Sequence, residues 1–261
     1  MRIFVTGASG WIGSAVTVEL LAQGHDVLGL ARSDAAAEKV AASGAEVLRG
    51  DVQDTDILRA GAEQADGVIH LAFRHDIAWT GQFAEAAASD RRAIELFGEV
   101  LAGSDRPLAI ASGVAGLKPG SIATERDEPD DDVSPRVASE HAALALADRG
   151  VRSMSVRFAP TVHGTGDHGF IARIIDADRS HRAAGYIGDG ENRWPAIHRS
   201  DAARLVRLGI EHAPAGSVLH AVAEEGVPMR DVAEAISRRF ELPATAISSE
   251  EAGAYSDGSQ D

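Results

Sequence analysis

The chain has 261 residues, of which 44% are hydrophobic, and a formal net charge of −15 at pH 7. This size fits one large α/β domain or one domain with a small appendage. The acidity argues against a nucleic-acid or anionic-membrane partner, because phosphate binding needs a basic surface. The absence of cysteine excludes disulfides and a cysteine nucleophile. We expect a cytoplasmic protein without a membrane span or signal peptide, since no apolar run is long enough and a core strand starts at residue 2.

The first predicted elements are a short strand, a glycine turn and a helix. An apolar run at residues 3–5 precedes TGASGWIG (6–13), and apolar residues at helical spacing follow. Glycines at these positions permit a sharp turn, close approach of a pyrophosphate to backbone N–H groups, and tight packing of helix against sheet. The anion then lies at a helix N-terminus, where the macrodipole favours negative charge. The pattern predicts a dinucleotide-binding loop formed by Gly7, Ser9, Gly10, Trp11, Ile12 and Gly13.

Strands and helices alternate through the following 150 or so residues. Strands are predicted at 26–31, 45–48, 67–72, 107–111 and 151–158, with helices at 35–43, 55–63, 83–101 and 134–148. This alternation requires parallel strands joined by right-handed crossovers. The predicted fold class is therefore α/β, a doubly wound parallel sheet of the Rossmann type that binds ligands at the carboxyl ends of its strands.

The pattern changes after Pro160. Residues 161–169 and 188–195 read as glycine-rich loops, with helices at 170–181, 200–212 and 229–240 and one strand at 218–222. We expect a dinucleotide-binding core at residues 1–160 and a small C-terminal substrate lobe at residues 161–255, interleaved with the core. The polar residues 256–261 are expected to form a disordered tail.

Together these motifs resemble the extended short-chain dehydrogenase/reductase superfamily, the NAD-dependent epimerase/dehydratase-like group. The resemblance rests on TGASGWIG (6–13), GDVQD (50–54), HLA (70–72), Ser112, PTVHG (160–164) and WPAIHRSDAARL (194–205), and it covers nearly the whole chain. It implies a nicotinamide cofactor with these further contacts: Asp51 and Val52 beside the adenine, Leu71, Ala72 and Phe73 along the cofactor, and Pro160, Thr161 and Val162 at the nicotinamide.

The residues after the second strand bear on the choice between NAD and NADP. An acidic residue there accepts hydrogen bonds from the ribose of NAD, whereas an arginine can bind the 2′-phosphate of NADP. This chain has Arg32 followed by the hydroxyl of Ser33, which favours NADP(H) over NAD(H). The alternative, which Asp34 leaves open, is that Arg32 is an ordinary surface residue.

The resemblance fails at the catalytic residues. The superfamily uses a tyrosine for proton transfer, a lysine four residues later and a serine that holds the substrate oxygen. Aligned on the Ala138-Ser139 step, Arg136 stands at the tyrosine position and Glu140 at the lysine position, while Ser112 is retained. A guanidinium stays protonated and cannot exchange a proton near neutrality. A glutamate would raise the pKa of a neighbouring phenol instead of lowering it, although it could accept hydrogen bonds from ribose hydroxyls.

Three functions are compatible with these residues. The first is an NADP(H)-binding oxidoreductase that acts by hydride transfer on a small carbonyl or alcohol, with Ser112 orienting the oxygen. The candidate acids are His163 first, His75 second and Tyr186 third. On its substrate side we expect Arg136, Tyr186, Arg193 and Trp194. The second is a non-catalytic NADP-binding redox sensor or regulatory protein. The third, a nucleotide-sugar epimerase or dehydratase, is disfavoured by the missing tyrosine and lysine.

Two further expectations concern metals and assembly. His163 and His168 have Asp167 between them, but without a third convergent ligand we expect no metal site. The resemblance implies a homodimer formed through the helices at 83–101 and 134–148.

Overall fold

The computed structural model describes residues 1–78, 80–130 and 134–257, with side chains described as far as residue 253. These residues form two compact units, each described separately below. The first unit contains residues 1–158 and 199–221, and the second contains residues 159–198 and those from 222 onward. None of the described helices is both long and apolar enough to cross a membrane.

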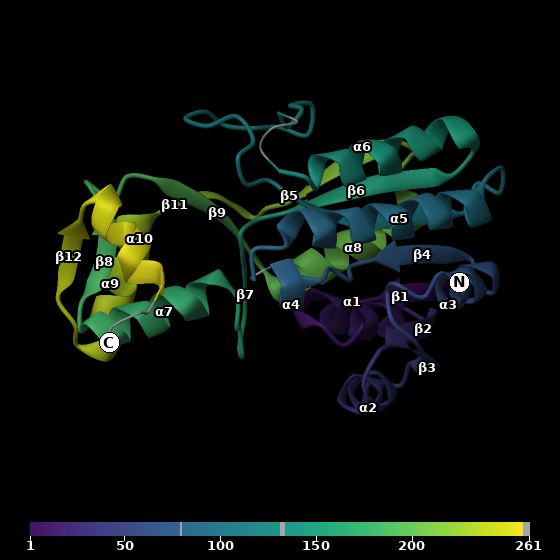
Figure 1. Cartoon of the computed structure of the whole chain (residues 1–261), viewed down its shortest axis with the longest axis horizontal. Helices are drawn as coiled ribbons and strands as arrows, with labels where there is room; N and C mark the ends of the chain where they lie inside the picture. Colours follow the sequence, from purple (N-terminus) through teal and green to yellow (C-terminus); the bar gives the residue numbers. More distant parts are fainter. Residues whose placement is uncertain (79, 131–133, 258–261) are drawn as a thin grey trace. The chain divides into compact units, whose positions relative to one another are not determined.

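A seven-stranded sheet forms the centre of the first unit (Figure 1). Its strands are β1 (Arg2–Thr6), β2 (Asp26–Ala31), β3 (Glu46–Arg49), β4 (Gly67–His70), β5 (Pro107–Gly113), β6 (Arg152–Phe158) and β10 (Ser217–Ala221). Their order is β10-β6-β5-β4-β1-β2-β3, and every neighbouring pair is parallel. The strand order reverses between β1 and β4, which confirms the predicted doubly wound sheet.

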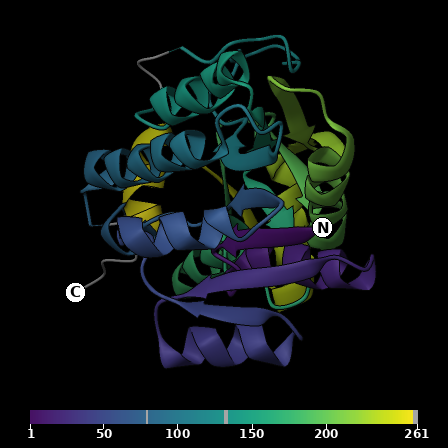
Figure 2. The same ribbon diagram turned by 90° about the vertical axis from the view of Figure 1, so that its right-hand side faces the viewer.

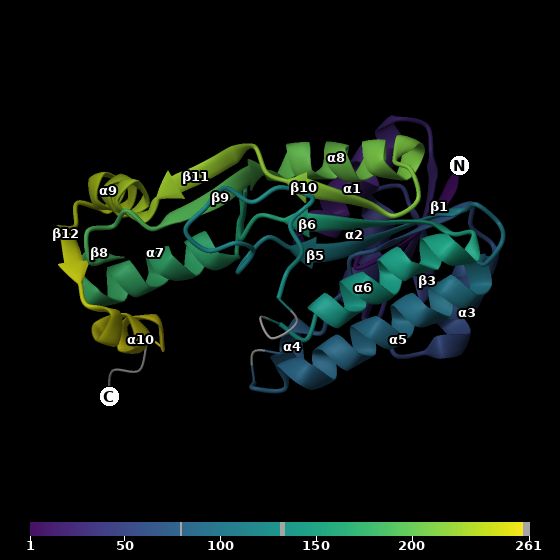
Figure 3. The ribbon, with the colours of Figure 1, turned by 90° about the horizontal axis from the view of Figure 1, so that it is seen from above.

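Helices cover both faces of this sheet. They are α1 (Trp11–Ala22), α2 (Asp34–Ala42), α3 (Thr55–Glu63), α4 (His75–Ala78), α5 (Phe83–Leu101), α6 (Val137–Ala145) and α8 (Arg199–His212), with a 3₁₀ turn at Leu146–Arg149. Seen from above, α1 and α8 lie on one side and α3, α5 and α6 on the other (Figure 3). Because both faces are covered, the central strands are apolar throughout, and Ile3, Phe4 and Val5 of β1 are fully buried.

The core on the α5 side is continuous from α3 to α6. Phe4 meets Phe97 edge to face with ring centroids 6.1 Å apart, and Leu108 and Leu146 belong to the same buried cluster. Figure 2 shows the N-terminal strand β1 beside β2, its neighbour in the sheet. This packing holds the carboxyl ends of β1, β2, β4 and β5 in fixed positions along one edge, where the cofactor contacts were predicted.

The second unit is built from two small sheets and three helices. Its strands are β7 (Thr161–His163), β8 (Ala184–Ile187), β9 (Arg193–His198), β11 (Glu224–Pro228) and β12 (Ala244–Ile247), and its helices are α7 (Phe170–His181), α9 (Met229–Phe240) and α10 (Ser249–Asp257). The sheets have the orders β11-β9-β7 and β12-β8. Ala184, Ala233 and Ile236 are buried at its core.

Several predicted boundaries were wrong. Residues 161–163 form β7 and residues 193–198 form β9, although loops were expected at 161–169 and 188–195. β4 ends at His70, β5 continues to Gly113, and the helix predicted from residue 134 begins at Val137. Helix α8 begins at Arg199, one residue before its predicted start. α10 extends to Asp257, so it includes two residues of the expected disordered tail, whose remaining residues lie outside the described chain.

Candidate cofactor and substrate site

The glycine turn between β1 and α1 leaves no space for side chains. Gly7 has φ of +72°, and a Cβ there would lie 2.8 Å from the backbone N of Ala72. A Cβ on Gly13 would lie 2.0 Å from the carbonyl oxygen of Gly7. The N–H of Gly10 donates to that same oxygen at 2.9 Å and closes the turn. Two of the glycines are therefore required by close backbone contacts that any side chain would break.

The turn presents the N-terminus of α1 to a ligand. Gly10 is the N-cap residue of α1. Because glycine has no side chain that could cap the helix, the first helical turn offers backbone N–H groups and the positive end of the helix dipole. Ser9 is half-buried in the turn, and Trp11 and Ile12 open the helix. These are the residues for which the sequence predicts contacts with the pyrophosphate of a dinucleotide.

Arg199, at the start of α8, is a charged neighbour of this turn that the sequence reasoning missed. Its Nε donates to the Trp11 carbonyl oxygen at 2.6 Å, its Nη2 donates to Ser14 Oγ at 2.6 Å, and its guanidinium lies 4.3 Å from the Trp11 ring centroid. Burial lowers the pKa of Arg199. The residue lies in the WPAIHRSDAARL motif, but nothing in that local pattern shows that it packs against a loop 188 residues earlier.

At the end of β2, the carboxylate of Asp34 is paired with one arginine, and a second arginine is exposed. Ser33 caps α2 by accepting a hydrogen bond from the N–H of Ala36 at 3.2 Å. Arg49 donates to the Ser33 carbonyl oxygen and to Asp34 Oδ1, both at 2.7 Å. Asp34 is therefore paired with a cation. Arg32 is exposed, with its Nη1 3.1 Å from Asp76 Oδ2.

The ends of β3 and β4 complete the cofactor side of the first unit. Asp51 and Val52 are half-buried in the turn after β3, with Asp51 Oδ1 accepting from the N–H of Gln53 at 3.0 Å. Leu71 and Ala72 follow β4 and contact the glycine turn, since a Cβ on Gly7 would touch both. The structure thus brings these residues to the same sheet edge as the glycine turn.

A buried polar chain lies behind this edge. His70 Nδ1 is 2.7 Å from Thr6 Oγ1, and His70 Nε2 is 3.3 Å from Asp90 Oδ1. Thr6 Oγ1 also accepts from the N–H of Ala72 at 3.3 Å. Burial alone would raise the pKa of Asp90, but the hydrogen bond and charge of His70, with the charge of Arg136, outweigh it and lower the pKa. This chain connects β1, β4 and α5 directly below the cofactor edge.

At the end of β5, Arg136 occupies the space beside Ser112. Its Nη2 donates to the Ala111 carbonyl oxygen at 2.6 Å, and its guanidinium lies 4.4 Å from the centroid of the Phe73 ring. Among the described residues no carboxylate forms an ion pair with it, and its buried Nε has no hydrogen-bond partner. The His75 ring packs edge to face on the Phe73 ring, with the two centroids 5.0 Å apart. The predicted residues Arg136, Phe73 and His75 therefore form one cluster, and Ser112 directly follows the residue whose carbonyl oxygen Arg136 binds.

Glu140, which stands at the lysine position, is one partner of a buried ion pair with Arg157. Its Oε1 accepts from Arg157 Nε at 2.8 Å and from Nη2 at 2.5 Å, and the two side chains are only 1% and 3% exposed. Arg157 also donates to the Asp127 carbonyl oxygen at 2.9 Å and pairs in register with Ser112. The residue at the lysine position of the superfamily therefore serves here to neutralise a buried arginine.

The other predicted residues belong to the second unit. His163 of β7 pairs in register with His198 of β9, with ring centroids 5.4 Å apart. Trp194 packs against Phe170 at 5.9 Å between centroids. The remaining predicted residues are these: Pro160, Thr161 and Val162 around the start of β7, Tyr186 under the Arg230 guanidinium, and Arg193, which donates to the Gly226 carbonyl oxygen at 3.0 Å. Within the described chain, no group of three or more His, Cys, Asp or Glu side chains could hold a metal ion.

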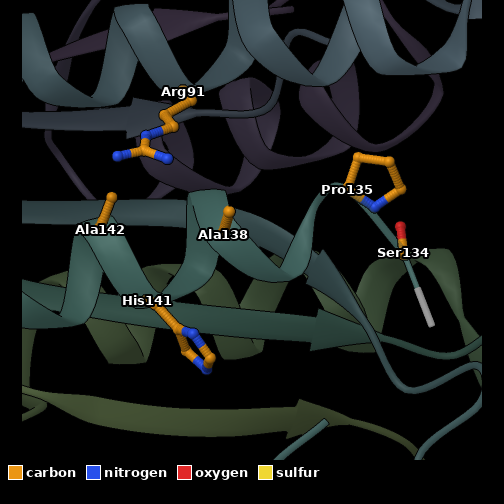
Figure 4. Close-up of a pocket in the computed structure, with 6 residues that line it drawn as sticks. All are labelled: Arg91, Ser134, Pro135, Ala138, His141 and Ala142. Atoms are coloured by element: carbon orange, nitrogen blue, oxygen red, sulfur yellow. The ribbon is translucent and has the colours of Figure 1, made fainter. Parts of the chain in front are cut away.

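A depression of about 360 Å³ lies on the outer face of the first unit, between α5 and α6 (Figure 4). It is lined by Arg91, Ser134, Pro135, Ala138, His141 and Ala142. Figure 4 shows small alanine side chains and the His141 ring along α6. The depression adjoins the helices through which the resemblance implies dimerisation.

The fold and the glycine turn define a dinucleotide-binding protein of the extended short-chain dehydrogenase/reductase class. The chain belongs to the NAD dependent epimerase/dehydratase family, whose profile matches residues 3–222. It is 46% identical to an uncharacterized protein of Schizosaccharomyces pombe, over 97% of this chain and 85% of that protein. It is 27% identical to the 4-hydroxy-2-methyl-3-oxo-4-farnesyl-3,4-dihydroquinoline-1-oxide ketoreductase of Stigmatella aurantiaca, over 84% of this chain and 67% of that enzyme.

Solved structures agree with this assignment. MoeE5 in complex with UDP-glucose and NAD superposes with a TM-score of 0.76 at 26% identity, over 95% of this chain and 85% of that chain. The dTDP-glucose 4,6-dehydratase DesIV of Streptomyces venezuelae, with NAD and TYD bound, gives a TM-score of 0.75 at 22% identity, over 95% and 84%. The second likeness shows the fold alone.

Proposed function

We propose that the protein is an NADP(H)-dependent oxidoreductase acting by hydride transfer on a small carbonyl or alcohol substrate. The observation that carries this proposal is the arrangement of Arg136, held by the Ala111 carbonyl oxygen beside Ser112 at the ligand-binding edge of the sheet. The ketoreductase relative, by its printed name, acts on a carbonyl group. When bound, the nicotinamide ring would supply or accept the hydride.

In this proposal Ser112 and Arg136 act on the substrate oxygen without exchanging its proton. The Ser112 hydroxyl orients the oxygen by a hydrogen bond. The permanent charge of Arg136 stabilises the negative charge that develops there during reduction. A planar guanidinium next to the reacting carbon would also favour substrates that carry a carboxylate.

The proton must then come from a group other than Arg136. His75 is the better-supported candidate, because its ring packs on Phe73, whose ring also contacts Arg136. An imidazole can give up a proton near neutral pH, either directly or through water. His163 of the second unit is kept as the alternative.

NADP(H) is proposed over NAD(H) because of the charges after β2. Arg32 is exposed and able to bind a 2′-phosphate, and the Ser33 hydroxyl lies at the N-terminus of α2. Asp34, which would oppose a phosphate, is paired with Arg49 at 2.7 Å. The balance of charge at this point therefore favours the phosphorylated ribose.

A second candidate function is a non-catalytic NADP(H)-binding sensor. It is favoured by one observation: Glu140 is committed to Arg157 in a buried pair, so neither residue of the usual Tyr–Lys pair has an equivalent here. Such a protein would bind the cofactor through the same glycine turn and turn nothing over.

Deuterium transfer separates the two functions. NADPH deuterated at C4 of the nicotinamide would be mixed with a panel of small aldehydes, ketones and 2-oxo acids, and the products examined by mass spectrometry. We expect stereospecific transfer to at least one substrate, with kcat/KM lowered about 100-fold or more by Ser112→Ala or Arg136→Gln. Arg59→Gln, in an exposed ion pair with Glu99, should leave the rate unchanged. NADPH binding without transfer to any member of the panel would favour the sensor.

A further inference from the structure

Two arginines share one carboxylate at the ribose end of the cofactor site. Arg32 Nη1 lies 3.1 Å from Asp76 Oδ2. Arg74 donates from Nε to Asp76 Oδ1 at 2.9 Å and from Nη2 to Asp76 Oδ2 at 3.1 Å. Two guanidinium groups thus face one carboxylate, and the charges of Asp51 and Glu85 also act on Arg74.

Arg74 also reaches the loop expected beside the adenine. Its Nη1 donates to Gln53 Oε1 at 2.5 Å, and the N–H of Gln53 donates to Asp51 Oδ1 at 3.0 Å. Arg74 is thus fixed between the Asp51 loop and Arg32, with its side chain only 18% exposed. A residue in this position can contact the 2′ side of an adenosine whose base lies against that loop.

We propose that Arg74 is the second arginine of the 2′-phosphate site, and that Asp76 occupies this site until a phosphate displaces it. The inference rests on the proposed NADP(H) specificity. A phosphate carries more negative charge and more acceptor oxygens than a carboxylate, so two guanidinium forks bind it more strongly. Arg32 and Asp76 are 55% and 40% exposed, and an entering phosphate can therefore reach the pair.

Asp76 acts in this arrangement as a built-in competitor. The hydrogen bond from Arg74 lowers the pKa of Asp76, so the carboxylate stays ionised and holds both arginines when no phosphate is bound. Any 2′-phosphate must break these contacts before it makes its own. Removing the carboxylate should therefore strengthen phosphate binding, while removing Arg74 should weaken it.

The test uses the full chain with 2′-AMP and 5′-AMP as probes, which differ only in the position of the phosphate. Affinities would be measured by isothermal titration calorimetry, without any enzymatic turnover. We expect Arg74→Gln to weaken 2′-AMP binding about 10-fold or more, as loss of a charge-assisted hydrogen bond does. Asp76→Asn should tighten 2′-AMP binding by a factor of about 3 to 10 through loss of the competing charge. Both variants should change 5′-AMP binding less than about twofold.

Arg59→Gln is the matched control, because it removes the same charge from an exposed ion pair with Glu99 at 2.9 Å. It should leave both affinities unchanged. If Arg32→Gln weakens 2′-AMP binding but Arg74→Gln and Asp76→Asn do not alter it, this inference is overturned and the NADP(H) proposal stands. If Arg32→Gln has no effect on 2′-AMP either, the NADP(H) proposal itself fails.

Discussion

Glu140 and Arg157 form a buried ion pair in which one carboxylate oxygen accepts from both Nε and Nη2 of the arginine, at 2.8 and 2.5 Å. Glu140 comes from α6 and Arg157 from β6, and Arg157 also holds the carbonyl oxygen of Asp127 at 2.9 Å. The pair therefore ties helix, sheet and the long loop before α6 together. A position that serves catalysis in the superfamily has become a structural one in this chain.

Removing one partner of this pair should destabilise the protein strongly. Glu140→Gln leaves the Arg157 guanidinium buried without its counter-charge, which costs about 3–5 kcal/mol of unfolding free energy. Glu140→Lys, which restores the residue of the superfamily, should be at least as damaging because it buries two cations together. Urea denaturation followed by circular dichroism measures both effects. The control is Glu95→Gln in the exposed Arg91–Glu95 pair, expected to cost below about 1 kcal/mol. A Glu140→Lys variant of undiminished stability would show that the pair has no structural role.

Gly7→Ala should lower both stability and cofactor affinity. The substitution combines a positive φ with a Cβ placed 2.8 Å from the Ala72 backbone N, so we expect a loss of about 1–3 kcal/mol of unfolding free energy and little remaining NADPH binding. Gly24→Ala is the matched control, since Gly24 has a similar φ of +81° and nothing within 4 Å of the added Cβ. It should cost some stability and leave cofactor binding intact. Equal NADPH binding by the Gly7 variant and wild type would contradict a dinucleotide-binding role of the glycine turn.

Acid should destabilise the protein in part through His220. Burial lowers the pKa of this imidazole from its ordinary value of 6.5. The carboxylates of Glu125, Glu140 and Asp127 act to raise this pKa and the charge of Arg157 acts to lower it, and the net effect is a lowered pKa. The unfolded chain then binds more protons than the folded one between the lowered pKa and 6.5. The unfolding free energy should therefore fall as the pH drops through this window. His220→Gln should reduce that fall in urea denaturation at pH 7.5 and pH 5.5, and an unchanged slope would contradict the assignment.

Association through the outer face of α5 and α6 is a further prediction. The resemblance implies a homodimer there, and the small side chains along the depression in Figure 4 would allow a second copy of α6 to approach closely. Sedimentation equilibrium should give a dimer mass for the wild type. Ala138→Arg, a large charge in the middle of this face, should give monomers with unchanged stability. A monomer mass for the wild type would contradict this prediction.

Much of the fold could be predicted because its elements carry strong local patterns. The strand at Asp26–Ala31 and the helices at Thr55–Glu63 and Phe83–Leu101 have the bounds that their apolar runs indicate. β7 and β9 could not be found in the same way. β7 has three residues, and β9 contains Pro195 and follows a glycine-rich turn, so neither shows a clear alternating pattern.

The site could be predicted only where a local motif defines it. The glycine turn needs no distant partner to be recognised, and Arg136 was visible as a departure from a known spacing. The contacts of Asp76 with Arg32 and of Arg199 with Trp11 gave no signal, because they join residues 44 and 188 positions apart in the chain. Contacts of this range depend on the strand order, which brings the ends of β2 and β4, and α1 and α8, together.

Calorimetric titration of NADPH into the wild-type protein and the Gly13→Ala variant tests the central claim most directly. A Cβ on Gly13 would lie 2.0 Å from the Gly7 carbonyl oxygen, so the variant closes the glycine turn while every charged side chain of the site remains. We predict one saturable NADPH site in the wild type, tighter for NADPH than for NADH, and at least a 100-fold loss of affinity, about 2.7 kcal/mol, in the variant. Equal NADPH binding by the two proteins, or none by the wild type, would contradict a dinucleotide site at this turn.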